Sequence, residues 1–113
     1  MDIFRLEKGG AVAEGFPVKG ASRTEFVVMA GSTARVPLGL SDRDGQIPKL
    51  RQKLINDDIL ASHAKQDDLL IFVQNFRFTS PTAAGNIING ANLSGVEPWL
   101  HISTGQSLKD WLP

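Results

Sequence analysis

The sequence predicts a small α+β domain in which a mainly antiparallel sheet is accompanied by two principal helices, at about residues 48–59 and 81–89. Short apolar segments, separated by glycine-rich or polar turns, fill the first third of the chain and are typical of strands. Later the apolar spacing changes to steps of three and four residues, which is typical of a helix. The 113 residues are enough for one core and too few for two comfortable ones, so we expect a single domain over 1–113.

Three strands are predicted in the first third of the chain, at 3–6, 11–18 and 25–36. In the second of them Val12, Phe16 and Val18 share one face, because alternate residues of a strand point to the same side of a sheet. Residues 26–29 are apolar without alternation, which is typical of a strand covered on both faces. We therefore expect the third segment to be the central strand.

The first helix is predicted to begin near Pro48, because the missing N–H of proline needs no partner in the first helical turn. Apolar residues lie at helical spacing around and after it, namely Ile47, Leu50, Leu54 and Ile55. The polar segment 61–68 is expected to be a turn. Residues 69–78 are expected to form one strand, since their large apolar side chains alternate.

The second helix has both a start and a stop signal. Ser80 is a natural N-cap, Pro81 a natural first helical residue and Gly90 a natural stop. The remaining expectations are a loop over 92–95, a short last strand over 99–102, and a turn or short helix over 106–112.

Composition argues against several classes of function. Twelve Lys and Arg residues balance 12 Asp and Glu residues, so no net field draws the chain to nucleic acid or to an anionic membrane. There is no cysteine for a disulfide or a cysteine-based zinc site. The longest apolar runs hold about five residues, against roughly 20 for a membrane-spanning helix, and the start of the chain does not resemble a secretion signal. We expect a soluble cytoplasmic protein without membrane contact.

No residue pattern predicts a catalytic centre. The serines lie in contexts that cap helices or close turns, without a nucleophile-elbow pattern. His63 and His101 are far apart in the sequence and match no metal-ligand spacing with the neighbouring loop aspartates. The glycine-rich turns fit neither a P-loop nor a dinucleotide fingerprint. We therefore expect no catalytic, cofactor-binding or metal-binding residues and no enzymatic activity.

The sequence does not exclude a site that binds nucleic acid. The N–H groups that follow Ser80 could bind a phosphate with help from Arg77, although Ser80 could equally satisfy those groups itself. Trp99 and Trp111 could stack on a base, but burial against the sheet is the more common fate of tryptophan. The candidate nucleic-acid-binding residues are Arg35, Lys49, Arg51, Lys53, Arg77, Ser80, Thr82 and Asn92.

Several of these motifs together resemble a known group of bacterial domains. They are the segment Gly31 to Arg35, the helical Leu50, Arg51 and Leu54, the strand residues Leu70 and Phe72, the run from Phe78 to Ala84, and then Gly90, Trp99, Gly105, Ser107 and Leu108. Over roughly residues 10–110 the chain is similar to a domain of unknown function found at the C-terminus of some GIY-YIG nucleases and restriction–modification proteins. It also resembles the restriction-enzyme and adenine-methylase associated domain. The resemblance implies an accessory module, without catalytic residues, that helps a nuclease or methyltransferase engage DNA.

Two hypotheses of function follow. The first is a non-catalytic, DNA-associated accessory module that binds nucleic acid weakly or through a partner protein. The second is a protein-interaction or self-assembly domain, in which an apolar surface near Trp99 or Trp111 docks a partner or a second copy. The first predicts that the basic side chains share a face, and the second that they scatter while an apolar surface stays exposed. The oligomeric state stays open.

Overall fold

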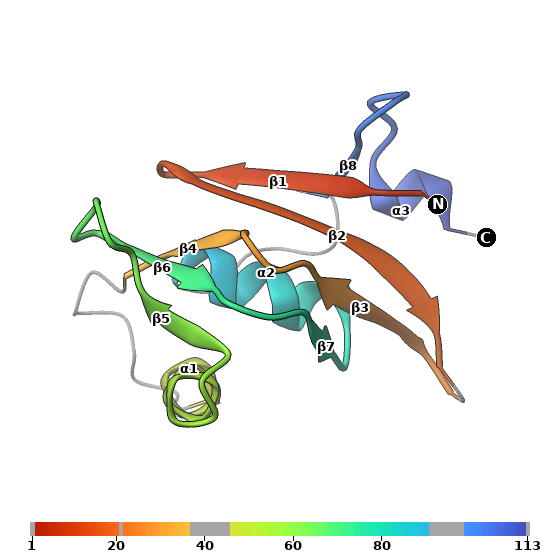
Figure 1. The fold of residues 1–113 in the computed structure, drawn as a ribbon. Helices are drawn as coiled ribbons and strands as arrows, with labels where there is room; N and C mark the ends of the chain where they lie inside the picture. Colours follow the sequence, from red (N-terminus) through yellow and green to blue (C-terminus); the bar gives the residue numbers. More distant parts are fainter. Residues whose placement is uncertain (1, 21, 37–45, 91–98, 113) are drawn as a thin grey trace.

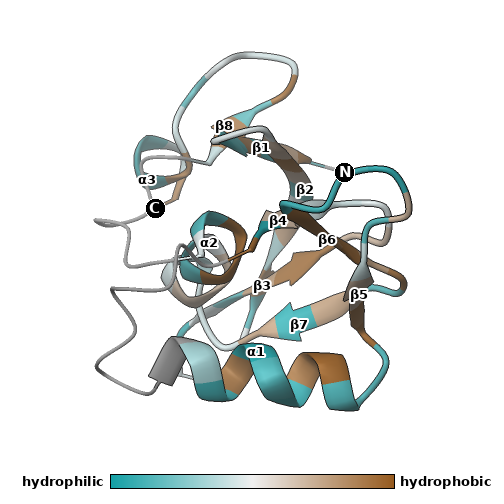
Figure 2. Cartoon of the chain, turned by 90° about the vertical axis from the view of Figure 1, so that its left-hand side faces the viewer, coloured by the Kyte–Doolittle hydropathy of each residue, from teal (hydrophilic) through white to brown (hydrophobic). Residues whose placement is uncertain are grey.

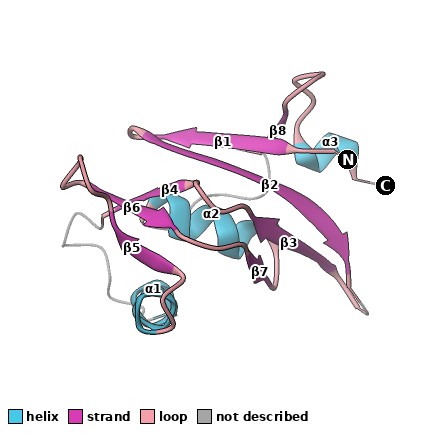
Figure 3. Ribbon diagram, viewed as in Figure 1, coloured by secondary structure: helices cyan, strands magenta, loops and turns pink. Residues whose placement is uncertain are grey.

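The computed structural model of the chain describes residues 2–20, 22–36, 46–90 and 99–112. The elements in these ranges are β1 (Phe4–Lys8), β2 (Ala11–Lys19), β3 (Thr24–Val28), β4 (Thr33–Arg35), α1 (Gln46–Asn56), β5 (Leu60–Ser62), β6 (Leu69–Phe72), β7 (Phe76–Phe78), α2 (Pro81–Asn89), β8 (Leu100–His101) and α3 (Leu108–Trp111). The mixture of antiparallel strands with two substantial helices confirms the predicted α+β class (Figure 3). The predicted loop over 92–95 lies outside the described residues.

The strands form two sheets. The larger sheet has the order β7-β3-β2-β1-β8 and the smaller sheet the order β4-β6-β5, and every pairing in both is antiparallel. Helix α2 lies behind both sheets, so that the strands of the larger sheet face the viewer in Figure 1. In Figure 2 the same helix is seen nearly end-on, on one side of the strands. The core therefore lies between α2 and the sheet faces that are turned toward it.

The segment 25–36 does not form the single central strand that the sequence predicts. It divides into β3, in the larger sheet, and β4, in the smaller one, and the turn between them contains Gly31 with φ of +93°. Segment 69–78 divides in the same way into β6 and β7. Because both segments change sheets, strands of the two sheets pack against the same helix, α2, which no local pattern encodes. The middle strand of the larger sheet is β2, with β3 beside it.

The large apolar residues of β2 lie on its outer face, and the opposite face of the strand is buried. Ala11, Ala13 and Gly15 are buried, whereas Val12 is 42% exposed and Phe16 is half-buried. Small side chains point inward because α2 packs closely on that face through its own small residues, including Ala84 and Gly85. The larger residues of β2 are consequently left on the outer face of the sheet.

Helix α1 begins two residues before the predicted start and ends three residues before the predicted end. It ends at Asn56 because Asp58 takes a left-handed conformation, with φ of +59°, and the N–H of Ile59 turns back to the carbonyl of Leu54 at 2.8 Å. The chain then enters β5, so part of the predicted 61–68 turn is an edge strand of the smaller sheet. No helix among the described residues has the length and apolarity needed to cross a bilayer.

Helix α2 agrees with its sequence signals. The Oγ atom of Ser80 accepts a hydrogen bond from the N–H of Ala83 at 3.0 Å, and Pro81 is the first helical residue. Gly90 has φ of +76° and its N–H donates to the carbonyls of Asn86 and Ile87. The predicted helix over 81–89 is confirmed.

The expected burial of tryptophan is confirmed for Trp99, which is 1% exposed. Its indole N–H donates to the carbonyl of Pro81 at 3.1 Å, and its ring lies 4.4 Å from that of Phe26. Trp111 is half-buried and meets the ring of Phe4 edge-on at 5.3 Å. Both tryptophans therefore attach the C-terminal segment to the inner face of the larger sheet.

Candidate functional site

A groove between the two principal helices gathers part of the predicted nucleic-acid site. It has a volume of about 420 Å³ and is lined by Lys49, Leu50, Lys53, Thr79, Ala83, Asn86 and Ile87. We call it the interhelix groove. Lys49 and Lys53 lie one helical turn apart on α1, which places both ammonium groups on the same side of that helix. The wall that faces them comes from α2 and from the segment that leads into it.

The two lysines differ in their surroundings. The Nζ atom of Lys53 lies 2.7 Å from the carboxylate of Asp57, one turn further along α1. Both side chains of this pair are largely exposed, so the pair is weak and a phosphate could replace the carboxylate. Lys49 is exposed and has no ion-pair partner within the described part of the chain. The groove therefore presents at its mouth the ammonium group of Lys49, unpaired among the described residues, and the ammonium group of Lys53, which is paired with Asp57.

The remaining predicted residues do not join this cluster. Arg51 is buried, with 7% exposure, although it lies on the same helix as the two lysines. Arg35 donates from Nη1 to the Oδ1 atom of Asn89 at 3.1 Å and lies against Gly9, where an added Cβ would come within 2.5 Å of its Nε. Both arginines therefore pack between secondary-structure elements, which sequence spacing does not reveal.

The side chain of Arg77 points away from α2. Its neighbours Phe76 and Phe78 turn toward the core, so by alternation Arg77 points to the outer face of the larger sheet, where it forms an ion pair with Glu25. Ser80 and Thr82 stand at the start of α2, next to the groove residue Thr79. Asn92 lies outside the described residues.

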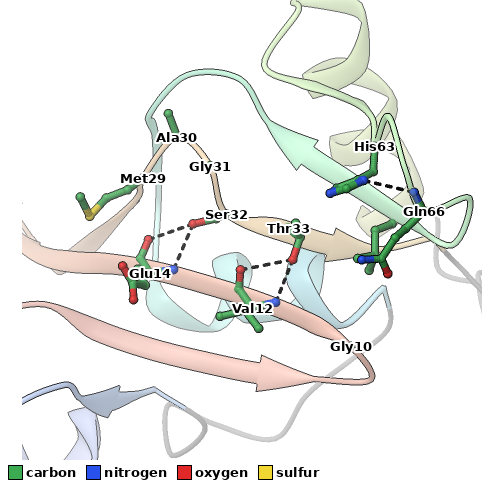
Figure 4. A pocket seen from close by; sticks show the side chains of 11 residues that line it. Gly10, Val12, Glu14, Met29, Ala30, Gly31, Ser32, Thr33, His63 and Gln66 are labelled. Carbon is green, nitrogen blue, oxygen red and sulfur yellow. Dashed lines mark hydrogen bonds between the residues drawn. The ribbon is translucent and has the colours of Figure 1, made fainter.

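A second hollow, of about 410 Å³, lies where the two sheets meet and was not predicted from the sequence. We call it the junction pocket. Its lining brings together a histidine, a carboxylate and two hydroxyls, from the full set Gly10, Val12, Glu14, Met29, Ala30, Gly31, Ser32, Thr33, His63, Gln66 and Leu69 (Figure 4). The residues come from three separate segments of the chain, 10–14, 29–33 and 63–69, so no sequence spacing could reveal the pocket.

The two hydroxyls of the junction pocket replace part of a strand ladder. The Oγ atom of Ser32 accepts from the N–H of Glu14 at 3.0 Å and donates to its carbonyl at 3.3 Å. Thr33 does the same for Val12, accepting at 2.8 Å and donating at 3.3 Å (Figure 4). These bonds satisfy the edge of β2 where β4 has left the larger sheet. The glycine-rich segment around Gly31 is therefore a structural junction.

The histidine and the carboxylate of the pocket are also engaged elsewhere. The Nδ1 atom of His63 accepts from the N–H groups of Lys65 and Gln66, at 3.1 and 3.2 Å, so neutral His63 carries its proton on Nε2. Glu14 accepts two hydrogen bonds from Arg5, at 3.0 and 2.7 Å. Because each group bonds to a different neighbour, the arrangement has no relay from acid to histidine to hydroxyl.

Replacing Ser32 by alanine tests the structural role of its hydroxyl. Ser32 is 5% exposed, so the S32A variant leaves the N–H and carbonyl of Glu14 without that partner. We expect the free energy of unfolding to fall by about 1–3 kcal/mol in urea denaturation. Ser62→Ala, at an exposed position of β5, is the control and should stay within about 0.5 kcal/mol of the parent. Equal stability of the two variants would contradict this role.

The second histidine also closes a turn. The Nδ1 atom of His101 accepts from the N–H groups of Ser103 and Thr104, and its Nε2 lies 2.9 Å from the carboxylate of Asp2. In the part of the chain that the structure describes, no three His, Cys, Asp or Glu side chains cluster in a way that could hold a metal ion.

The architecture defines the class of this protein: a small α+β domain in which two antiparallel sheets share one central helix. The family model described as domain of unknown function DUF4357 matches residues 4–112, so the chain belongs to that family. No curated protein and no solved structure matches the chain.

Proposed function

We propose that this domain is a non-catalytic accessory module that contacts DNA weakly through its interhelix groove, or that is brought to DNA by a partner nuclease or methyltransferase. The observation that carries the proposal is the pair of exposed lysines at the mouth of that groove. The resemblance to domains that accompany restriction–modification proteins also supports an accessory role in DNA contact. The proposed place of action is the cytoplasm.

The geometry of α1 suits a phosphate backbone. Lys49 and Lys53 are separated by about 6 Å along the helix axis, from a rise of about 1.5 Å per residue. That spacing spans roughly two phosphates of one strand, which follow each other every 3.4 Å or so along the duplex. Thr79 and Asn86, on the other wall of the groove, supply a hydroxyl and an amide of the kinds that bind phosphate and sugar oxygens.

The absence of catalysis is part of the proposal. Its support is that the histidine, carboxylate and hydroxyl of the junction pocket each serve a separate structural bond. A module of this kind adds affinity or placement to an enzyme that performs the chemistry. The proposal therefore predicts no hydrolysis or methylation of DNA by this domain alone.

Weak, salt-dependent binding is the expected result of titrating plain and adenine-methylated duplex DNA into the domain. With two phosphates contacted, the logarithm of affinity should fall with the logarithm of salt concentration with a slope of about −2, from a dissociation constant on the order of 10⁻⁴ to 10⁻⁶ M. Affinity should thus drop roughly tenfold between 50 and 200 mM salt. A preference between the two duplexes would point to readout of the modified base.

Matched charge variants locate the interface. Reversing both groove charges, with Lys49→Glu and Lys53→Glu, should abolish binding at low salt and remove the salt slope. Arg77→Gln is the control, because Arg77 lies on the outer sheet face and should leave the affinity unchanged. Absence of binding by the parent domain at low salt, or equal losses from both sets of variants, would contradict the groove as a DNA site.

A further inference from the structure

The outer face of the larger sheet carries apolar residues on β8, β1, β2 and β3, with charged residues between them. We define this outer face by the residues that point away from α2, namely Ile3, Arg5, Glu7, Val12, Glu14, Phe16, Val18, Glu25, Val27, Met29, Arg77, Leu100 and Ile102. Among the described residues no helix lies over it, since α2 and α3 are on the other side of the sheet (Figures 1 and 2). Val12, Leu100 and Ile102 are 42%, 47% and 47% exposed.

The strand register arranges these residues in two central rows that run across the strands. The first row holds Ile102, Ile3, Phe16 and Val27, in the order β8, β1, β2, β3. The second row, in the same order of strands, holds Leu100, Arg5, Glu14 and Met29. Each row therefore has its own pair of facing residues at β1 and β2, flanked by apolar residues on both sides.

The positive charges of the outer face already have partners. Arg5 donates to Glu14 at 3.0 and 2.7 Å and lies 3.9 Å from Glu7, while Arg77 pairs with Glu25. The hydrogen bond and the charge of Glu14 raise the pKa of Arg5. Its three carboxylates, of Glu7, Glu14 and Glu25, outnumber its two guanidinium groups, so the outer face does not attract a polyanion. Its exposed apolar rows instead suit a protein surface of the same kind.

The rows are self-complementary under a two-fold rotation. An axis that lies along the strands, between β1 and β2, brings β1 of one copy over β2 of the other. In the second row this sets Arg5 opposite Glu14 of the second copy, and Glu14 opposite its Arg5. In the first row it sets Ile3 against Phe16 and Ile102 against Val27. Like charges meet nowhere in these two rows, which is the condition for a stable symmetric contact.

The shape of the outer face agrees with this arrangement. A hollow of about 350 Å³ lies over β1 and β8, lined by Arg5, Glu7, Leu100, His101, Ile102 and Gly105. The same rotation places the side of β3 that carries Val27 and Met29 over this hollow. Two sheets packed face to face lie about 10 Å apart and are rotated by about 30°, so side chains of this size meet across the gap.

We propose that the outer face of the larger sheet is a homodimer interface, in which a second copy of this chain packs with β1 over β2 and pairs Arg5 with Glu14 across the contact. The interface is separate from the interhelix groove and does not depend on DNA binding. The lining of the interhelix groove includes no residue of the outer face, so dimerisation and DNA contact would use different residues.

Charge reversal and mixing test the proposal. Sedimentation or light scattering of the full chain should show a dimer that forms with rising concentration. Arg5→Glu alone and Glu14→Arg alone should each raise the dimer dissociation constant by about tenfold or more, because like charges then meet across the axis. An equimolar mixture of the two variants should dimerise again, since each reversed charge faces its opposite. Restored association also shows that both variants are folded.

Apolar variants give a second, independent test. Leu100→Lys with Ile102→Lys should weaken the dimer, because both side chains are exposed on this face. Val73→Lys is the matched control: Val73 is an apolar residue with 54% exposure in the β6–β7 connection, outside this face. A parent chain that stays monomeric up to roughly 1 mM overturns the proposal and points to an unlike partner. Failure of the mixture to associate overturns the proposed register.

Discussion

Alanine in place of Gly15 is expected to destabilise the domain more than any other single methyl group added to its strands. Gly15 lies in β2 on the face that meets α2, and a Cβ there would come within 2.2 Å of the backbone carbonyl of Val27 and 2.5 Å of the ring of Phe26. The carbonyl belongs to the neighbouring strand and cannot move without separating β2 from β3. We expect a loss of about 3 kcal/mol in the free energy of unfolding, measured in urea, and a fall of roughly 10 °C in Tm.

Gly10→Ala is the matched control for this prediction. Gly10 has φ of +88° and an added Cβ there meets nothing within 4 Å, so its replacement tests backbone strain without crowding. That strain costs about 1–2 kcal/mol. A loss at Gly15 no larger than the loss at Gly10 would show that the two strands accommodate the methyl group.

Truncation of Trp99 to alanine is expected to cost about 3–5 kcal/mol of stability. The ring is 1% exposed and packs against the ring of Phe26 at a tilt of 41°. Its N–H donates to the carbonyl of Pro81, so the side chain joins the C-terminal segment to both α2 and the larger sheet. The loss is a substantial part of the total stability of a small domain, about 5–15 kcal/mol. Urea denaturation followed by circular dichroism measures it.

Two further variants separate the parts of this effect. Trp99→Phe keeps an aromatic ring against Phe26 but removes the N–H donor, and should cost about 1–2 kcal/mol. Trp111→Ala removes a half-buried ring and should cost less than Trp99→Ala. Equal losses for the two alanine variants would contradict the central position of Trp99 in the core.

The candidate site could be predicted from the sequence only in part. Of the eight residues that the sequence predicts to contact nucleic acid, Lys49 and Lys53 line a common groove. Arg51 has the same charge and lies between them in the sequence, yet it is buried. Helical periodicity places residues on a face of α1, but only the position of the neighbouring elements decides which face meets solvent.

The junction pocket could not be found from the sequence for a related reason. Its lining joins residues near 12, 31, 63 and 66, which become neighbours only because segments 25–36 and 69–78 change sheets at the same level. The hydrogen bonds from Gly31 to Phe72 and from Phe72 to Ser32 hold the two crossing segments together, at 2.8 Å each. The spacing of residues in the sequence does not indicate where a segment passes from one sheet to the other.

The sequence by itself determined the α+β class and the second helix, because Ser80, Pro81 and Gly90 act through bonds within a few residues of themselves. Only the tertiary structure decided which face of β2 is buried, where the long strand segments break, and which charges reach the surface. A period of two residues states which side chains share a face, whereas burial depends on what packs there. For β2 that packing partner is α2, about 70 residues further along the chain, and its close approach selects the small residues for the core.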